Sequence, residues 1–236
     1  MPRIPLIEDL TTKPVPLGSN LLVEFEPTSQ WYNASITIAA GWLRTGGIVP
    51  YTVHTQPPEN IRLQLKRLGL NTVELERKDT LRIWDYYSAT LGQKSNERLS
   101  VDSLKVADLS IFYAKDSTGI RGPPIPDRLR MDDNLSVLGR FNEEKSWVEF
   151  VLTRVLPMAS LRQSTLISGV MKGVHSEWAY SQLEGAFDGV IDFKFEENNV
   201  GETRDLIRIR NMRNVFFTKG WHSLRIGENF EVTLEK

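Results

Sequence analysis

The feature that most constrains the fold is a strand, a short loop and a helix within residues 18–43. Gly18 precedes an apolar run at 21–23, which is typical of a buried strand. The polar residues 26–30 follow, and apolar side chains then recur at helical spacing from Ala34 to Leu43. Phosphate-binding loops occur in such a frame of strand, tight loop and buried helix. The segment therefore predicts an α/β fold and raises the question of a phosphate site.

The following residues continue this alternation. Strands are predicted at 48–53 and 81–84, from their apolar and β-branched composition. Between them, Pro58 suits the first turn of a helix, and Gly69 stands where that helix should end. Strands that alternate with helices of this length favour a mostly parallel sheet flanked by helices.

The middle of the chain continues the pattern less regularly. We expect a loop at 91–100, a helix or a mixture of helix and strand at 101–114, and a connection at 119–126. Strands are predicted at 129–133 and at 165–167, the second ending at Ser168 and Gly169, and a short helix at 176–186. Between the two strands, a helical stripe at 147–155 is predicted to be capped by Asn142 and stopped by Pro157.

The two ends of the chain differ from this pattern. Residues 1–17 are rich in proline and predict an irregular lead-in to one domain that spans 18–236. From Asp188 onward the apolar residues alternate with polar ones, as in Ile207 and Ile209 between Arg208 and Arg210. This period of two predicts antiparallel strands at the C-terminus.

Composition limits the classes of function. The formal net charge of −1 gives no overall electrostatic reason to expect a nucleic-acid or membrane partner. The absence of cysteine excludes disulfides, thiolate nucleophiles and cysteine zinc sites. No segment approaches the roughly 18 unbroken apolar residues of a spanning helix, and the first residues lack the apolar core of a signal peptide. A cytoplasmic protein is therefore expected.

Four segments carry a resemblance in their order and spacing: residues 18–23, 51–61, 131–138 and 207–213. Together they resemble the RecA superfamily, and more closely the archaeal KaiC-related ATPase domains, over residues 16–235. The resemblance implies a RecA-like, P-loop NTPase core. It places Asp133 at the metal-orienting position of the Walker B strand, and it implies ATP and Mg²⁺ as ligands if nucleotide binding persists.

The chain departs from that family where phosphate should bind. A Walker A loop needs glycines whose backbone N–H groups turn toward phosphate, a lysine on the β- and γ-phosphates and a hydroxyl on magnesium. Aligned through 21–23, this chain has Phe25, Gln30, Trp31 and Tyr32 at those positions. The degenerate loop consists of Glu26, Pro27, Thr28, Ser29, Gln30, Trp31 and Tyr32.

Further departures concern catalysis and the neighbouring subunit. The family's paired catalytic glutamates fall at Thr55 and Gln56, which cannot act as bases. The interface lysine falls at Asn211, whereas Arg213 remains. The resemblance thus implies a pseudo-ATPase that serves in regulation or assembly. Because family members associate side by side, it also implies a homo-oligomer or pairing with a paralogous KaiC- or RecA-like subunit, with Arg213 donated across the interface.

Two other functions remain open. His54, Asp85, Asp133, Ser168 and His175 stand at or just beyond predicted strand ends, where ligands gather in such sheets. The histidines and carboxylates among them could form a metal or hydrolytic site, in which Asp133 acts with His54 or His175, or they could serve as caps and hydrogen-bond partners.

The second open function is a DNA-associated recombinase paralogue. The C-terminal arginines would supply its basic surface, although acidic residues nearby in the sequence favour an ion-paired or subunit-contact face. These arginines are Arg204, Arg208, Arg210 and Arg213. The segment 169–175 could in addition cradle an anion or form a flexible turn.

Overall fold

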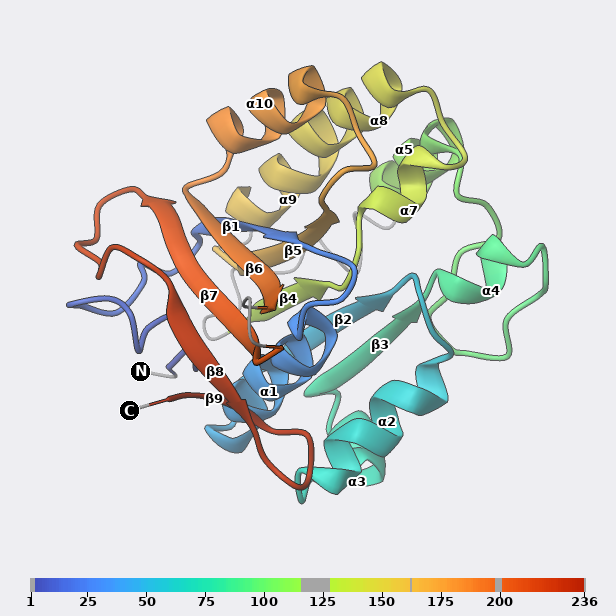
Figure 1. Ribbon diagram of the computed structural model, residues 1–236. Helices are drawn as coiled ribbons and strands as arrows, with labels where there is room; N and C mark the ends of the chain where they lie inside the picture. The colour runs from blue at the N-terminus through green and yellow to red at the C-terminus, as the bar shows by residue number, and fades with distance from the viewer. Residues whose placement is uncertain (1–2, 116–127, 162, 198–200, 236) are drawn as a thin grey trace.

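A nine-stranded sheet runs through the molecule in the order β3-β2-β4-β5-β1-β6-β7-β8-β9 (Figure 1). The computed structural model describes residues 3–115, 128–161, 163–197 and 201–235. Every pairing from β3 to β6 is parallel, and the pairings from β6 to β9 are antiparallel. This arrangement confirms the predicted fold class. The strands are β1 (Asn20–Phe25), β2 (Val49–Val53), β3 (Leu81–Asp85), β4 (Leu129–Asp132), β5 (Thr165–Met171), β6 (Gly189–Glu197), β7 (Thr203–Met212), β8 (His222–Ile226) and β9 (Val232–Leu234).

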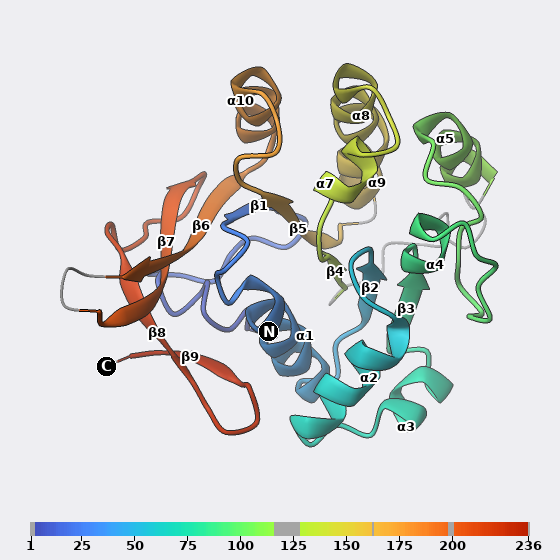
Figure 2. The same cartoon turned by 45° about the vertical axis from the view of Figure 1, so that its right-hand side comes forward.

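Helices cover both faces of the parallel part, as Figure 2 shows. One layer contains α1 (Trp31–Arg44), α2 (Pro58–Arg67) and α3 (Thr72–Arg77). The other contains α5 (Val106–Lys115), α7 (Ser136–Gly139), α8 (Glu144–Phe150), the π-helical turn η1 (Val151–Val155), α9 (Leu156–Leu161) and α10 (Glu177–Ala186). The short α4 (Tyr87–Thr90) follows the carboxyl end of β3.

Two hydrophobic cores follow from these layers. Leu21 and Val23 of the central strand β1 point into the core beneath α1 and α2, whereas Leu22 points into the core beneath α8, α9 and α10. Both faces of β1 are therefore buried, which explains its nearly continuous apolar sequence.

The first residues pack against the sheet domain through turns. Ile4, Leu6 and Ile7 are buried in the core shared with α1. The buried Glu8 carboxylate accepts hydrogen bonds from the backbone N–H groups of Ile4 (3.0 Å) and Val15 (2.7 Å), which closes the segment on itself.

Three details differ from the sequence-based expectations. Asn142 does not cap α8; its Oδ1 accepts from the backbone N–H of Val106 at 2.9 Å and so caps α5 instead. Pro157 does not stop the helix, because the π-helical turn η1 precedes it and the chain continues into α9. β5 runs on through Ser168 and Gly169 to Met171.

The remaining middle segment is only partly described. The helix α5 begins at Val106, and residues 101–105 are not helical, since the backbone of Val101 pairs with that of Asp85 (3.3 Å). The connection expected at 119–126 lies outside the described residues.

Candidate functional site at the strand ends

The strand-end site is centred on Asp133, the residue that follows β4. Because β2 and β4 are parallel neighbours, His54 at the end of β2 lies beside it. Asp133 Oδ1 accepts from the His54 backbone N–H at 2.9 Å and lies 2.8 Å from the His54 Nδ1. Both side chains are buried, with 1% and 0% of their surfaces exposed. The pair is thus held away from solvent.

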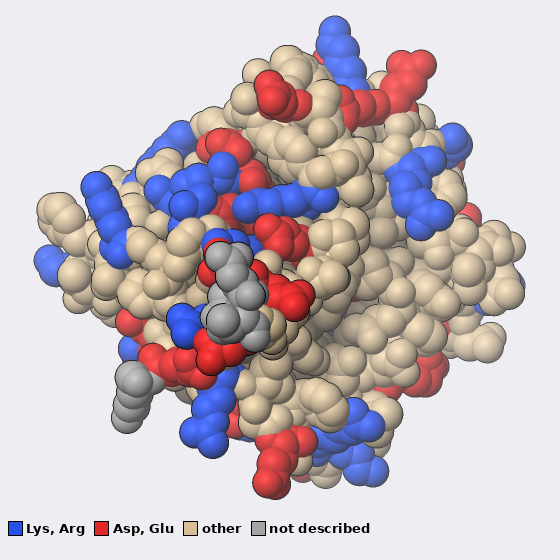
Figure 3. All heavy atoms as spheres, viewed as in Figure 1, with Lys and Arg blue, Asp and Glu red and all other residues tan. Residues whose placement is uncertain are grey.

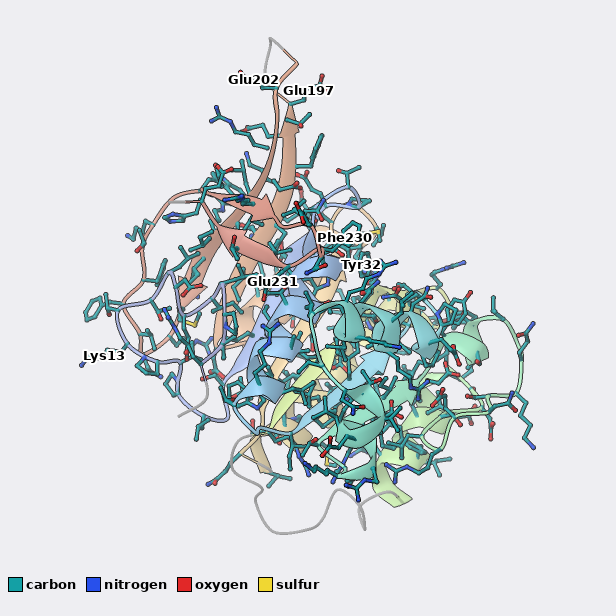
Figure 4. All side chains as sticks on the ribbon, turned by 90° about the horizontal axis from the view of Figure 1, so that it is seen from below. Lys13, Tyr32, Glu197, Glu202, Phe230 and Glu231 are labelled. Carbon is teal, nitrogen blue, oxygen red and sulfur yellow. The ribbon has the colours of Figure 1, made fainter. Side chains whose placement is uncertain are left out.

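A second set of hydrogen bonds closes the other side of Asp133. The Thr55 hydroxyl donates to Asp133 Oδ2 at 2.9 Å. Tyr32, which stands near the amino end of α1 in Figure 4, accepts from Asn134 Nδ2 through its hydroxyl oxygen at 3.1 Å. Burial and the Asp133 charge raise the pKa of Tyr32 above its ordinary value. Both carboxylate oxygens of Asp133 therefore already accept hydrogen bonds from protein groups.

Trp31 fills the space between the loop and the strand ends. Its ring is fully buried, and its Nε1–H donates to the Asp133 carbonyl oxygen at 2.7 Å. The rings of Phe25 and Phe193 flank it, with centroid distances of 6.1 and 5.5 Å. A Cβ at Gly169 would lie 2.4 Å from both the Asp133 carbonyl oxygen and Trp31 Nε1, so only glycine fits there.

The loop between β1 and α1 directs few N–H groups outward. The Glu26 N–H donates to the Phe193 carbonyl oxygen (3.1 Å) and the Ser29 N–H to the Glu26 carbonyl oxygen (3.0 Å), while Pro27 has no N–H. The Glu26 carboxylate accepts from the Phe195 N–H at 3.2 Å and adds negative charge. The basic residue of α1 is Arg44, in its last turn. These features are the reverse of a phosphate cradle.

The other candidate ligands lie in separate networks. Asp85 accepts from the hydroxyls of Ser88 and Ser95 at 2.6 Å each. His175 stacks on Trp147 with ring centroids 4.2 Å apart and faces Glu144, and burial lowers its pKa. The described part of the chain holds no group of three or more histidine and carboxylate side chains placed to bind a metal ion. Of the four metal candidates, only His54 and Asp133 are in contact.

The remaining predicted residues have ordinary structural contacts. Ser168 lies inside β5, and its hydroxyl donates to Asp132 Oδ2 at 3.1 Å. Gln56 accepts a long hydrogen bond of 3.4 Å from Gln64. Asn211 is exposed near the end of β7, and the exposed Arg213 just beyond donates to the Gly185 carbonyl oxygen at 2.7 Å.

Comparison with solved structures identifies the fold. The KaiC-like protein PH0186 of Pyrococcus horikoshii OT3 superposes with a TM-score of 0.75 over 100% of this chain and 97% of that one, at 16% sequence identity. The fold is KaiC-like. No protein-family model matches the chain, and no curated protein matches it in sequence.

One charged cluster of this KaiC-like fold escaped the sequence analysis. Asp192, fully buried in β6, pairs with Lys172 and Arg208 at 2.7 Å each. Glu24 of β1 pairs with Arg210 at 2.6 Å, and burial raises the pKa of Glu24 to about 7. The signal was present, since Glu24 and Asp192 each stand within a run of apolar residues, in LLVEF of β1 and VIDF of β6.

This cluster decides how the C-terminal arginines are used. Figure 3 shows basic and acidic side chains side by side over β6 and β7. Arg208 and Arg210 are ion-paired on their own chain, as the more conservative interpretation held. The β6–β7 hairpin projects from the molecule with the acidic Glu197 and Glu202 near its tip (Figure 4). Among the described helices, none is long and apolar enough to cross a bilayer.

Proposed function

We propose that this protein is a catalytically degenerate KaiC-like domain that does not hydrolyse ATP by the P-loop mechanism and acts in regulation or assembly. The observation that carries the proposal is the burial of Trp31. Aligned through β1, its ring takes the place of the family's phosphate-binding lysine, and its indole N–H is hydrogen-bonded to the Asp133 carbonyl oxygen.

Phosphoryl transfer depends on positioned positive charge and backbone donors. P-loop enzymes supply a lysine, a magnesium ion and a set of N–H groups around the transferred phosphate. Here an aromatic ring replaces the cation. The N–H groups of Glu26 and Ser29 already donate to the carbonyl oxygens of Phe193 and Glu26. A nucleotide would also meet the Glu26 carboxylate. Binding in the standard pose would therefore require the loop and Trp31 to move together.

The metal-orienting and catalytic-base positions are also unfavourable for such chemistry. Asp133 is engaged by His54 and Thr55, so that it must break hydrogen bonds before it can orient a magnesium ligand. Thr55, at one of the catalytic glutamate positions, has no basicity near neutral pH, and neither has the adjacent Gln56. The loop and base positions are thus changed together, while the metal-orienting Asp133 is kept but held by protein hydrogen bonds.

A role in assembly fits the scaffold that remains. The KaiC-like sheet is kept, and the exposed Arg213 lies at the end of β7, where the resemblance expects a subunit contact. We propose self-association or pairing with a paralogous subunit through this edge. A DNA-associated role has less support, because Arg208 and Arg210 are neutralised by Asp192, Glu24 and Glu184.

Phosphate release from ATP in the presence of Mg²⁺ tests the proposal directly. We expect no turnover above a protein-free control, and turnover that disappears in Asp133→Asn would refute it. The double variant Trp31→Lys, Tyr32→Thr should not gain activity, because Phe25 and Gln30 remain in the loop. Light scattering on the purified protein, with Arg213→Ala as the variant, tests self-association separately.

A further inference from the structure

A cavity of about 300 Å³ lies over the face of β3, β2 and β4 that turns toward α5 and α9. Its lining begins near the amino ends of these strands, at Pro50 and Arg82, and at Ser164 just before β5. The strand-end site lies beyond the opposite, carboxyl ends. The cavity is therefore a separate feature of the fold, and we call it the β2–β4 cavity.

Strand alternation explains why this face is hollow. In β2, Val49, Tyr51 and Val53 point into the core beneath α1 and α2, while Pro50 and Thr52 line the cavity. The same period puts Arg82 and Trp84 of β3 toward the cavity. Polar and large aromatic side chains thus occupy this part of the sheet face, whereas Leu22 of β1 and Leu166 and Val170 of β5 point into the hydrophobic core on the same side.

The lining is rich in positive charge. Four arginines, Arg82, Arg98, Arg128 and Arg130, line it together with a single carboxylate, Asp79, among the described residues. Asp79 lies at the rim and pairs with Arg82 at 2.5 Å and Arg98 at 2.9 Å. Arg130 in addition lies 3.5 Å from Asp132, so that, with Arg128 left aside, the three guanidinium groups of Arg82, Arg98 and Arg130 stand against the two carboxylates of Asp79 and Asp132. This excess of positive charge favours an anion.

Arg130 is the cation best placed to receive that anion. Burial acts to lower the pKa of Arg130, but the neighbouring Asp132 carboxylate raises it above its ordinary value, so Arg130 stays charged. Its Nη2 lies 3.5 Å from Asp132 Oδ1 and donates to the Tyr113 hydroxyl. Within the described chain these contacts use only Nη2, although a guanidinium has five N–H donors in a planar fork. Among the described residues, Nε and Nη1 have no hydrogen-bond partner, and each offers a charged donor to an anion.

An aromatic wall completes the cavity. The rings of Trp84 and Phe112 meet edge to face at a centroid distance of 5.5 Å, and both line the cavity with Tyr113. Aromatic faces of this kind stack on bases, with a contribution of roughly 1–3 kcal/mol for each base. The hydroxyls of Thr52 and Ser164 add donors and acceptors for a sugar.

We propose that the β2–β4 cavity binds a nucleoside monophosphate, with the phosphate on Arg130 and the rim arginines and the base against Trp84 and Phe112. The volume is at the small end of the range for small-molecule sites, which suits one ring system and one phosphate better than a dinucleotide. No magnesium is required, because the guanidinium groups neutralise the phosphate.

This site would also be in contact with the strand-end site. Tyr86 lines the cavity, and its ring lies 5.0 Å from the His54 ring, edge to face. A bound ligand would therefore be one side chain away from the pair of His54 and Asp133. The cavity site does not require ATP at the strand ends.

The test is calorimetric titration of the full chain in magnesium-free buffer with AMP, GMP, CMP and UMP in turn. We expect at least one to bind with a Kd below about 1 mM. Adenosine has the base without the phosphate, and ribose 5-phosphate has the phosphate without the base. If AMP is the ligand, each should bind at least about tenfold more weakly than AMP. No binding by any of the four monophosphates would overturn the proposal.

Variants locate the binding. Arg130→Gln should weaken it about tenfold to a hundredfold, since it removes a charged donor, and Trp84→Leu about tenfold. Arg225→Gln, the same charge change on the exposed β8, is the matched control and should leave affinity unchanged. If Arg130→Gln does not fold, the exposed Arg98→Gln replaces it, with a smaller expected loss.

Two outcomes separate this proposal from the previous one. Binding that survives Arg130→Gln and Trp84→Leu but is lost in Asp133→Asn would place the ligand at the strand ends and refute the cavity site. ATP turnover would refute the degenerate mechanism and leave the cavity site standing, provided that monophosphate binding still responds to Arg130→Gln.

Discussion

The strand-end site and the β2–β4 cavity lie along the same parallel strands, and they differ in what fills them. At the strand ends, Trp31 is fully buried and Asp133 has protein hydrogen bonds on both carboxylate oxygens. In the cavity, about 300 Å³ remains open beside Arg130 and Trp84. The region where this fold usually binds ligands is packed, and a region with no role in the resemblance is open.

The difference shows how one sheet can carry a packed region and an open one. The bulky Trp31 ring at the start of α1 is part of the core, because a close-packed interior tolerates neither a void nor an added group. On the other face, polar residues of β2, β3 and β4 keep the cavity open, because apolar helices do not pack closely on a surface that carries arginines. We therefore expect substitutions at the strand ends to act mainly on stability, and substitutions at the cavity to act mainly on binding.

The largest expected effect comes from emptying the packed region. Trp31→Ala removes a fully buried ring and its hydrogen bond to Asp133, and should lower the free energy of unfolding by about 3–5 kcal/mol. Urea denaturation measures this. Trp178→Ala on α10, where 45% of the side chain is exposed, is the control and should cost far less. Equal losses for the two would contradict a packed strand-end site.

Adding one methyl group to the same region should have the next largest effect. Gly169→Ala places a Cβ 2.4 Å from the Asp133 carbonyl oxygen and Trp31 Nε1, and should cost about 1–3 kcal/mol. Gly185→Ala in α10 meets nothing within 4 Å and should instead stabilise by about 0.5–1 kcal/mol. The Trp31→Ala, Gly169→Ala double variant should lose less than the sum of the two, because the clash with the indole is gone.

The pH dependence of stability adds to the comparison, because Glu24 is a buried carboxyl group of the central strand β1 and pairs with Arg210. The pKa of Glu24 is raised by burial from 4.5 to about 7 in the folded protein. Folding therefore favours the protonated carboxyl, so its contribution to stability is present below pH 4.5 and is lost as the pH rises to about 7. The fall in unfolding free energy between pH 4.5 and 7 should be shallower in Glu24→Gln than in the wild type, and unchanged in the exposed Glu59→Gln.

The smallest effect on stability is expected at the rim of the cavity. Arg82 and Asp79 form a partly exposed pair, with 23% and 46% of their side chains exposed, so Arg82→Gln should change the free energy of unfolding by less than about 1 kcal/mol. The same variant should weaken monophosphate binding severalfold. A large loss of stability at Arg82 would mean that this rim is structural, and the contrast between the two regions would fail.

Much of the fold could be predicted from local patterns. The apolar strand at 21–23, the helix that follows it and the alternation after Asp188 appear in the structure as β1, α1 and the antiparallel strands. Local chemistry was misleading where two segments compete for one side chain. Asn142 precedes a helix and looks like its cap, yet its side-chain oxygen accepts a hydrogen bond from the N–H of the earlier Val106. Pro157 looks like a stop, yet a π-helical turn accommodates it.

The site was less predictable, because it depends on which strand ends meet. The sequence showed that the loop lacks a lysine and glycines, and that His54, Asp85, Asp133 and His175 stand near strand ends. It did not show that only His54 and Asp133 touch, since that follows from β2 and β4 being neighbours. Asp85 instead accepts a hydrogen bond from Ser88, and His175 stacks on Trp147.

The sequence by itself determined the class of fold and the absence of lysine and glycine from residues 24–32, because both are properties of short segments with their own periodicity and chemistry. Only the tertiary structure decided that the Trp31 ring is buried against Asp133, because this depends on Gly169 in β5, far away in the chain, leaving room for the indole. Only the tertiary structure opened the β2–β4 cavity, because it brings Arg82 and Trp84 of β3 and Arg130 of β4 onto one face.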